Sequence, residues 1–155
     1  MDNLTVEQAL EVLLAHSKII EETEVVPVLQ ARGKVLAEDM VAELDNPPFD
    51  KSPIDGYACK AEDFIGVSKE HPAELKVLEE IDAGQYSNIT VEKGQAVRIM
   101  TGAAVPAGCD CCVRQEDTDY GEDTVKIFYP TRQWQNYCYQ GEDFKRGTVL
   151  LKKGT

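Results

Sequence analysis

Three loop segments of this chain gather oxygen-bearing side chains on short connections that glycine and proline stiffen. The segments are Asn46–Ala58, Arg98–Gly108 and Gly141–Asp143. Their oxygen donors are Asp50, Ser52, Asp55, Thr101, Glu142 and Asp143. Carboxylates and hydroxyls in such positions can bind cations or polar substrates, and loops on a rigid scaffold are where binding and catalytic groups concentrate. The three segments are therefore the candidate functional residues of the chain.

Each segment also has a purely structural interpretation. Pro47–Pro48 excludes helix and Asp55–Gly56 favours a turn, so a stiff domain boundary explains the first segment as well as a functional role does. Thr101–Gly108 lacks the Gly-Lys-Ser/Thr of a Walker loop, and a strand connection without a ligand explains it about equally well. Gly141–Asp143 alone is a common acidic turn. On the residues alone, both interpretations stay open.

The elements that position these loops begin with an amphipathic helix. Thr5 and Gln8 form a capping box, and apolar residues then recur on one face. We expect this helix to reach about Ser17. The run Val25–Leu29 resembles a short strand leading into a helical turn that ends at Gly33, and Lys34–Ala42 fits helix or strand.

From Pro47 onward the pattern changes to short apolar runs between turn residues, which indicates a β-rich module. The spacing of the runs suits a small sandwich or barrel. The expected strands are Gly56–Cys59, Leu75–Leu78 with a continuation to Ile81, Gln95–Ile99, Cys111–Arg114, Val125–Phe128 and Val149–Leu151. The sequence thus predicts a mixed α+β, β-rich fold.

Composition excludes several classes of partner. The 155 residues are 43% hydrophobic, which is enough for a buried core, and 16 Lys and Arg oppose 28 Asp and Glu for a net charge of −12. Such a chain repels nucleic acid and anionic lipid. The N-terminus has no signal-peptide pattern and no segment approaches the ~20 apolar residues of a membrane span. We expect a soluble, cytoplasmic protein with no nucleic acid or membrane partner.

Two possible metal sites are better explained structurally. The five cysteines include the cluster Cys109, Cys111 and Cys112, but they lack zinc-type spacing or nearby histidines, so we interpret them as buried apolar residues. Asp117–Asp123 resembles a calcium loop, yet its glycine stands one position early and Phe128 occupies the place of the bidentate glutamate. A hairpin tip fits better. Around His16 and His71 the sequence shows no pattern of a catalytic nucleophile and its base.

The order of motifs resembles the MoeA/gephyrin E-domain family of molybdopterin molybdenumtransferases. The matching patterns are PPFDxSxxDGYA from Pro47, RIMTGAxxPxGxD from Arg98, and GED at Gly141–Asp143, preceded by a related pattern over Pro27–Asp39. The two long motifs are specific, whereas GED alone is not. The resemblance runs over nearly the whole chain.

The resemblance implies an enzyme that inserts molybdenum from molybdate into adenylylated molybdopterin, with Mg²⁺-dependent release of AMP. It implies catalytic roles for Asp55, Thr101 and Asp143, helper roles in cofactor binding for Ser52 and Glu142, and a Mg²⁺ or molybdate site at Asp55 and Asp143. Oxygen ligands suit Mg²⁺ far better than cysteines do.

The resemblance also implies a domain organisation. Residues 1–45 with 139–155 would form a discontinuous, elongated linker domain, and residues 46–138 an inserted β-rich domain. The family's MogA-like and C-terminal domains would be absent from this chain. Family homodimers complete each site with the MogA-like domain of the partner subunit, so we expect the isolated fragment to be inactive.

This chain departs from the family in two places, and one alternative function remains. Tyr137–Gln140 replaces an arginine-bearing stretch that often precedes GED, and Lys51 and Pro53–Ile54 vary the first motif. The alternative is a non-catalytic module that binds or scaffolds other proteins.

Overall fold

The computed structural model describes residues 4–155, and the chain divides into two compact units. One unit comprises the residues up to Asp39 together with Lys152–Thr155, and the other comprises Met40–Leu151. The predicted domain boundaries, 1–45 with 139–155 and 46–138, stay a prediction. Among residues 4–155, no helix combines the length and apolarity that crossing a membrane requires.

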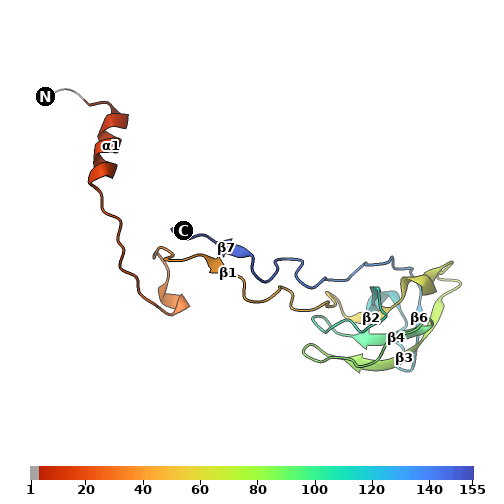
Figure 1. Ribbon diagram of the computed structural model, residues 1–155. Coiled ribbons are helices and arrows are strands. Elements are labelled where there is room, and N and C mark those ends of the chain that lie inside the picture. Colours follow the sequence, from red (N-terminus) through yellow and green to blue (C-terminus); the bar gives the residue numbers. More distant parts are fainter. Residues whose placement is uncertain (1–3) are drawn as a thin grey trace. The chain divides into compact units, whose positions relative to one another are not determined.

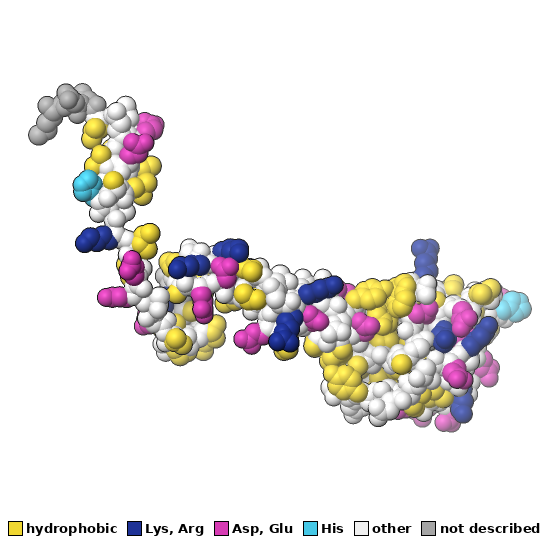
Figure 2. Space-filling model, in the orientation of Figure 1, with side chains coloured by type: hydrophobic (Ala, Val, Ile, Leu, Met, Phe, Trp, Pro, Cys, Tyr) yellow, Lys and Arg dark blue, Asp and Glu magenta, His cyan; other side chains and the backbone are white. Residues whose placement is uncertain are grey.

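The first unit contains the helix α1 (Val6–His16), labelled in Figure 1. The Thr5 hydroxyl accepts a hydrogen bond from the Gln8 amide, and the Gln8 side chain accepts one from the Thr5 amide, at 3.3 and 2.9 Å. The predicted capping box and helix are therefore confirmed. None of the helix residues is buried, and Figure 2 shows its apolar side chains at the surface.

The chain after α1 differs from the expected pattern. The strand-like run Val25–Leu29 forms no strand: Val28–Gln30 is a 3-10 helix, followed by Gly33 at φ 80°. Pro27 explains part of this, because it fixes φ and has no amide hydrogen for a strand pair. Of Lys34–Ala42, which fitted helix or strand, only Met40–Val41 is a strand.

The second unit opens and closes with a two-stranded ladder. Strand β1 (Met40–Val41) pairs antiparallel with β7 (Val149–Leu151), which confirms the predicted C-terminal strand. The Ala42 amide extends the pairing by donating to the Thr148 carbonyl at 2.8 Å. First and last segments of this unit are thereby held side by side (Figure 1).

Between these strands lies a five-stranded sheet with the order β5-β2-β4-β3-β6. Strands β3 and β4 are parallel and the other neighbours antiparallel. The bounds are β2 Gly56–Cys59, β3 Ala73–Ile81, β4 Gln95–Ile99, β5 Cys111–Arg114 and β6 Thr124–Ile127, with 3-10 turns at Ala61–Phe64 and Gln115–Asp117. Every strand predicted in this region is confirmed, with shifts of one or two residues at some ends.

The sheet curls so that the chain leaving one edge strand, β5, pairs with the other edge strand, β6. After β5, the chain passes through Gln115–Asp117, and Thr118 forms an antiparallel bridge with Ile127 of the other edge strand. The Tyr57 hydroxyl donates to the Gly121 carbonyl at 2.9 Å across this closure. Asp117–Asp123 is thus a hairpin tip, as predicted, and the mixed α+β, β-rich fold is confirmed.

The core lies on both faces of the sheet. All four residues of β2 are buried, with Tyr57 and Cys59 in one apolar cluster and Ala58 in the other. Side chains alternate between the two faces of a strand, so each face contributes to one cluster. Gly56 permits the close approach of β5, because a Cβ at that position would lie 1.8 Å from the Val113 carbonyl oxygen.

Candidate functional site

The segment Asn46–Asp55 lies between the other two candidate segments and is hydrogen-bonded to both. On one side, the Gly141 amide donates to the Pro47 carbonyl at 2.9 Å. Just before this candidate segment, Lys51 and Cys138 exchange two backbone hydrogen bonds of 2.9 and 3.0 Å. On the other side, the Ser52 amide donates to the Ala103 carbonyl at 3.0 Å. The structure therefore joins three stretches that are far apart in sequence. We call Asn46–Asp55 the middle segment.

Asp55 and Thr101 meet at the end of the middle segment. The Thr101 hydroxyl and the Thr101 amide both donate to Oδ1 of Asp55, at 2.6 and 2.8 Å. These two bonds, the hydroxyl first, lower the pKa of Asp55, which is exposed. Asp55 Oδ2 receives no donor from residues 4–155. An ionised carboxylate with one free oxygen is a ligand that a hard cation would accept.

Asp143 lies near the opposite end of the middle segment. The side-chain amide of Asn46 donates to Oδ2 of Asp143 at 2.8 Å, and the Asp143 amide donates to the Asn46 carbonyl at 3.0 Å. No hydrogen bond of the described residues joins Asp143 to Asp55 or Thr101. Within residues 4–155 no group of three or more His, Cys, Asp or Glu is arranged to hold a metal. Shared metal binding by Asp55 and Asp143 stays a prediction.

The two expected helper residues make local bonds. Ser52 is completely buried, and its hydroxyl donates to the Ile54 carbonyl at 2.7 Å and accepts from the Ile54 amide. Exposed Glu142 accepts a hydrogen bond from the Tyr139 amide at 2.9 Å, which closes the turn before it. These bonds stabilise the backbone turns next to Asp55 and Asp143.

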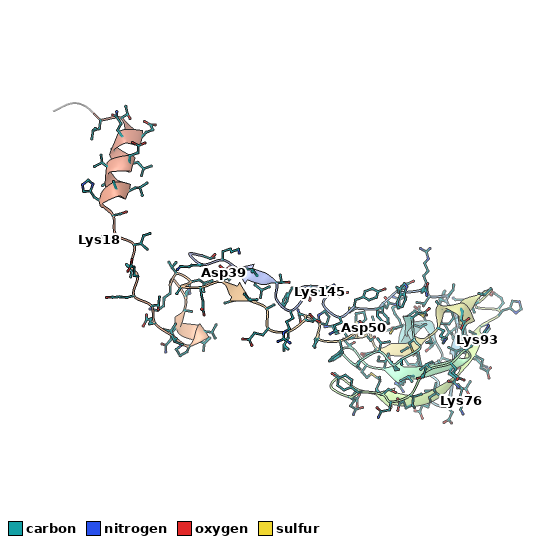
Figure 3. The ribbon with its side chains drawn as sticks, viewed as in Figure 1. Lys18, Asp39, Asp50, Lys76, Lys93 and Lys145 are labelled. Carbon is teal, nitrogen blue, oxygen red and sulfur yellow. The ribbon has the colours of Figure 1, made fainter. Side chains whose placement is uncertain are left out.

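Asp50 is a site residue to which the sequence assigned no role beyond that of an oxygen donor. Its carboxylate accepts from the Tyr137 hydroxyl at 2.8 Å and from the Gln140 amide at 2.7 Å. Burial, and then the bond to Asp50, raises the pKa of Tyr137. Asp50, labelled in Figure 3, lies on the chain that leads from β1 into the sheet. No signal in the sequence marks a contact between residues so far apart.

Aromatic side chains pack against one another in the loop that leads to Gly141–Asp143, the third candidate segment. The rings of Trp134, Tyr137 and Tyr139 lie with centroids 5.1–5.6 Å apart. The side-chain amide of Asn136 donates to the Cys112 carbonyl at 2.9 Å, and the Cys112 amide donates to the Gln135 carbonyl. The loop therefore covers the edge strand β5 and fixes the position of Gly141–Asp143.

The cysteines behave as the sequence predicted. Cys59, Cys109, Cys111 and Cys112 are buried free thiols, and only Cys138 is partly exposed. Burial raises the pKa of Cys112 to about 12, so its thiol stays protonated at neutral pH. The Cys109, Cys111 and Cys112 cluster is therefore part of the apolar core.

Comparison with known proteins gives one consistent family. The family model described as "MoeA N-terminal region (domain I and II)" matches residues 4–155. A molybdopterin molybdenumtransferase of Staphylococcus epidermidis is 44% identical over 125 residues, covering 81% of this chain and 30% of that protein. One from Staphylococcus aureus strain Mu50 is 41% identical over 145 residues, covering 90% and 35%.

A solved structure agrees with the sequence comparison. The crystal structure of the molybdopterin biosynthesis MoeA protein from Pyrococcus horikoshii OT3 matches with a TM-score of 0.88 and 41% identity, covering 95% of this chain and 39% of that one. The chain thus spans about a third of the length of these relatives. With the fold, the three motifs and these matches in agreement, the chain belongs to the MoeA family and corresponds to its N-terminal region.

Proposed function

We propose that this chain is the N-terminal part of a molybdopterin molybdenumtransferase and serves molybdenum cofactor biosynthesis. The reaction would insert molybdenum from molybdate into adenylylated molybdopterin, with Mg²⁺-dependent release of AMP. The observation that supports this most is the Asp55 carboxylate, whose Oδ1 accepts two bonds from Thr101 while Oδ2 accepts none from the described residues 4–155. Both residues occupy the acid and hydroxyl positions of the family's two long motifs.

The donor set fits a hard cation. Asp55 is exposed and its pKa is lowered, so it is ionised at neutral pH and offers Oδ2. Asp143 is exposed, and Asn46 holds its Oδ2. We infer that each of these carboxylates, together with water, would contribute to binding of Mg²⁺, whose charge would offset that of the phosphate oxygens of the substrate. The roles of the chain's own residues are to place and orient these oxygens.

Partners follow from the same proposal. Molybdate and adenylylated molybdopterin are anions, which a chain of net charge −12 repels unless a cation or a basic surface intervenes. We infer that a homodimer of the full-length protein supplies this surface through the MogA-like domain of the partner subunit. On this view the 155 residues alone do not catalyse the reaction. The full-length protein would act in the cytoplasm.

The test uses the full-length protein that contains this chain. Asp55→Asn and Asp143→Asn remove one charge each while keeping size and hydrogen bonding. We expect molybdenum insertion to fall about 100-fold or more, because a hard cation binds carboxylate oxygens far better than amides. Asp123→Asn is the matched control, since Asp123 is exposed on the hairpin tip away from the candidate segments. Urea midpoints would confirm that all three variants fold.

A protein-binding module is the second candidate. A hollow along β1 and β7 is lined largely by apolar residues, namely Met40, Val41, Leu44, Pro48, Phe144 and Leu150. Exposed apolar surface of this kind marks interaction sites. Unchanged molybdenum insertion in both Asp55→Asn and Asp143→Asn would favour this candidate and contradict the enzyme.

A further inference from the structure

The three candidate segments carry two cationic side chains, Lys51 and Arg98, and Arg98 is already paired with Glu80 at 3.5 Å. No other Lys or Arg occurs in Asn46–Ala58, Arg98–Gly108 or Tyr137–Asp143. Lys51 takes part in none of the ion pairs found within residues 4–155. A lysine with no carboxylate partner, in a region that carries several carboxylates, is positioned to interact with another anion.

The backbone places this lysine at the centre of the site. Lys51 pairs with Cys138 on one side and with Ala104 on the other, both antiparallel. Residues directly opposite each other in such pairs project from the same face, so the Lys51 side chain shares its face with those of Cys138 and Ala104. Neighbouring Ser52 projects to the opposite face and is completely buried. Lys51 is half-buried, which suits a stem packed on Ala104 and an ammonium group near solvent.

Cys138, the residue paired with Lys51, is affected by charges from two of the candidate segments. Burial and a hydrogen bond that the thiol donates to the Glu142 carboxylate raise the pKa of the Cys138 thiol, the charge of Lys51 lowers it, and the charge of Asp143 raises it. One thiol thus experiences the lysine of the middle segment together with both acids of Gly141–Asp143. Lys51 and Asp143 thus act in opposite directions on the thiol of Cys138, the residue paired with Lys51.

We propose that the Lys51 ammonium binds the substrate oxyanion, either molybdate or a phosphate group of the adenylylated substrate. This inference rests on the proposed function. A lysine binds a tetrahedral oxyanion as a point charge and donates charge-assisted hydrogen bonds to its oxygens. Lys51 would supply local attraction on a chain whose total charge repels both candidate anions.

Cys138 provides a reporter for binding in the 155-residue chain. Because the other four cysteines are buried, iodoacetamide at constant pH should modify Cys138 fastest, and mass spectrometry can follow the rate. Lys51→Gln should slow the modification, since it removes the charge that favours the thiolate. Molybdate bound at Lys51 should slow the wild type and leave Lys51→Gln unchanged. Lys76→Gln, on β3 (Figure 3), removes an equal charge elsewhere and should behave as wild type.

Inorganic phosphate is the second probe in the same assay. Slowing by molybdate alone assigns Lys51 to the molybdate site, and slowing by phosphate alone assigns it to a phosphate group of the other substrate. Slowing by both supports a general oxyanion site. If neither anion alters the rate in wild type, or if both alter it equally in wild type and Lys51→Gln, the proposal is overturned.

Kinetics of the full-length protein provide an independent test. Lys51→Gln should raise the KM of the anionic substrate about tenfold with little change in kcat, as expected for the loss of one charge-assisted contact. The double variant Lys51→Gln with Cys138→Arg should recover most of this loss, because it returns a cation to the same face of the strand pair.

The outcomes separate the two proposals. Unchanged KM in Lys51→Gln, together with loss of insertion in Asp55→Asn, overturns the role of Lys51 and leaves the proposed function standing. Unchanged insertion in Asp55→Asn counts against the proposed function, and the alkylation assay then still decides whether Lys51 binds an oxyanion.

Discussion

The five-stranded sheet and the helix α1 both carry regularly spaced apolar side chains but use them differently. In the sheet, Tyr57 and Ile99 are 0% exposed. In α1, Val6 is 81% exposed and Leu13 69% exposed. The sheet is therefore stabilised by contacts between distant parts of the sequence, whereas α1 is specified within this chain by its cap and residue pattern. The candidate site resembles the sheet in this respect, because its three segments come together only when the sheet unit has folded.

The largest effect should come from Gly56→Ala, which tests how tightly the sheet is packed. The added Cβ would lie 1.8 Å from the Val113 carbonyl oxygen. A backbone atom of a paired strand cannot move away as easily as the end of a flexible side chain. We expect the sheet unit to lose about 4 kcal/mol or more of unfolding free energy. Urea unfolding followed by the fluorescence of Trp134, the only tryptophan, measures this.

Gly66→Ala is the matched control for that experiment. Gly66 has φ 80° and no atom within 4 Å of an added Cβ, so only backbone strain of about 1 kcal/mol is expected. Equal losses in the two variants would contradict the close approach of β2 and β5.

Ile99→Ala should have the next largest effect and tests the contrast between the two regions directly. Removing this fully buried side chain should cost about 3 kcal/mol through lost burial and a cavity. Leu13→Ala, in the exposed helix α1, should change the same urea transition by less than about 0.5 kcal/mol. A large loss for Leu13→Ala would mean that α1 contributes to the stability of the sheet.

A smaller effect is expected for Thr5→Ala, which tests the local specification of α1. Loss of the hydroxyl that accepts from the Gln8 amide should destabilise the helix by about 1 kcal/mol. Amide exchange over Val6–His16 should accelerate, while the urea transition of the sheet stays unchanged. Thr5→Ser keeps the hydroxyl and should preserve protection, so equal exchange in both variants would show that the cap is not important.

The smallest effect concerns the Asp55 pKa. Thr101→Val removes the hydroxyl bond and keeps the amide bond, so the pKa of Asp55 should rise part of the way towards its ordinary value. An NMR titration of the carboxyl carbon measures the change, and Thr101→Ser should titrate as wild type. An unchanged pKa in Thr101→Val would mean that the hydroxyl does not stabilise the carboxylate.

The sign of the related pH dependence follows from the same bonds. The pKa of Asp55 is lower in the folded than in the unfolded chain, so its contribution to stability is fully present above the unfolded pKa of about 3.9. That contribution disappears as the pH falls through the lower, folded pKa. In Thr101→Val, the unfolding free energy should therefore fall less than in the wild type as the pH is lowered through this range.

Sequence patterns predicted the elements of the fold better than their arrangement. Short apolar runs between turn residues located the strands, and Thr5 with Gln8 located the start of α1. The parallel pairing of β3 with β4 could not be predicted, because it depends on contacts across the whole sheet. For Val25–Leu29 the predicted strand was wrong, because Pro27 has no amide hydrogen for a strand pair, whereas the predicted helical turn before Gly33 is confirmed.

The candidate site was predictable in part. Motif resemblance selected Asp55, Thr101 and Asp143, and the structure brings the first two into direct contact. Resemblance did not indicate that Asn46 holds Asp143, or that Asp50 joins the middle segment to Tyr137. These contacts link residues whose proximity arises only when the sheet has closed.

The position of the middle segment between two partners also limits how this protein can change over evolution. Because successive residues project to opposite faces, deleting one residue before Lys51 would turn its ammonium inward and the Ser52 hydroxyl outward. Pairing on both sides leaves no free edge on which such a shift could be absorbed. The segment should therefore accept exchanges of side chain but not a change of length. By contrast, the turn at Gly66, with open space around it, can take an insertion without disturbing the site.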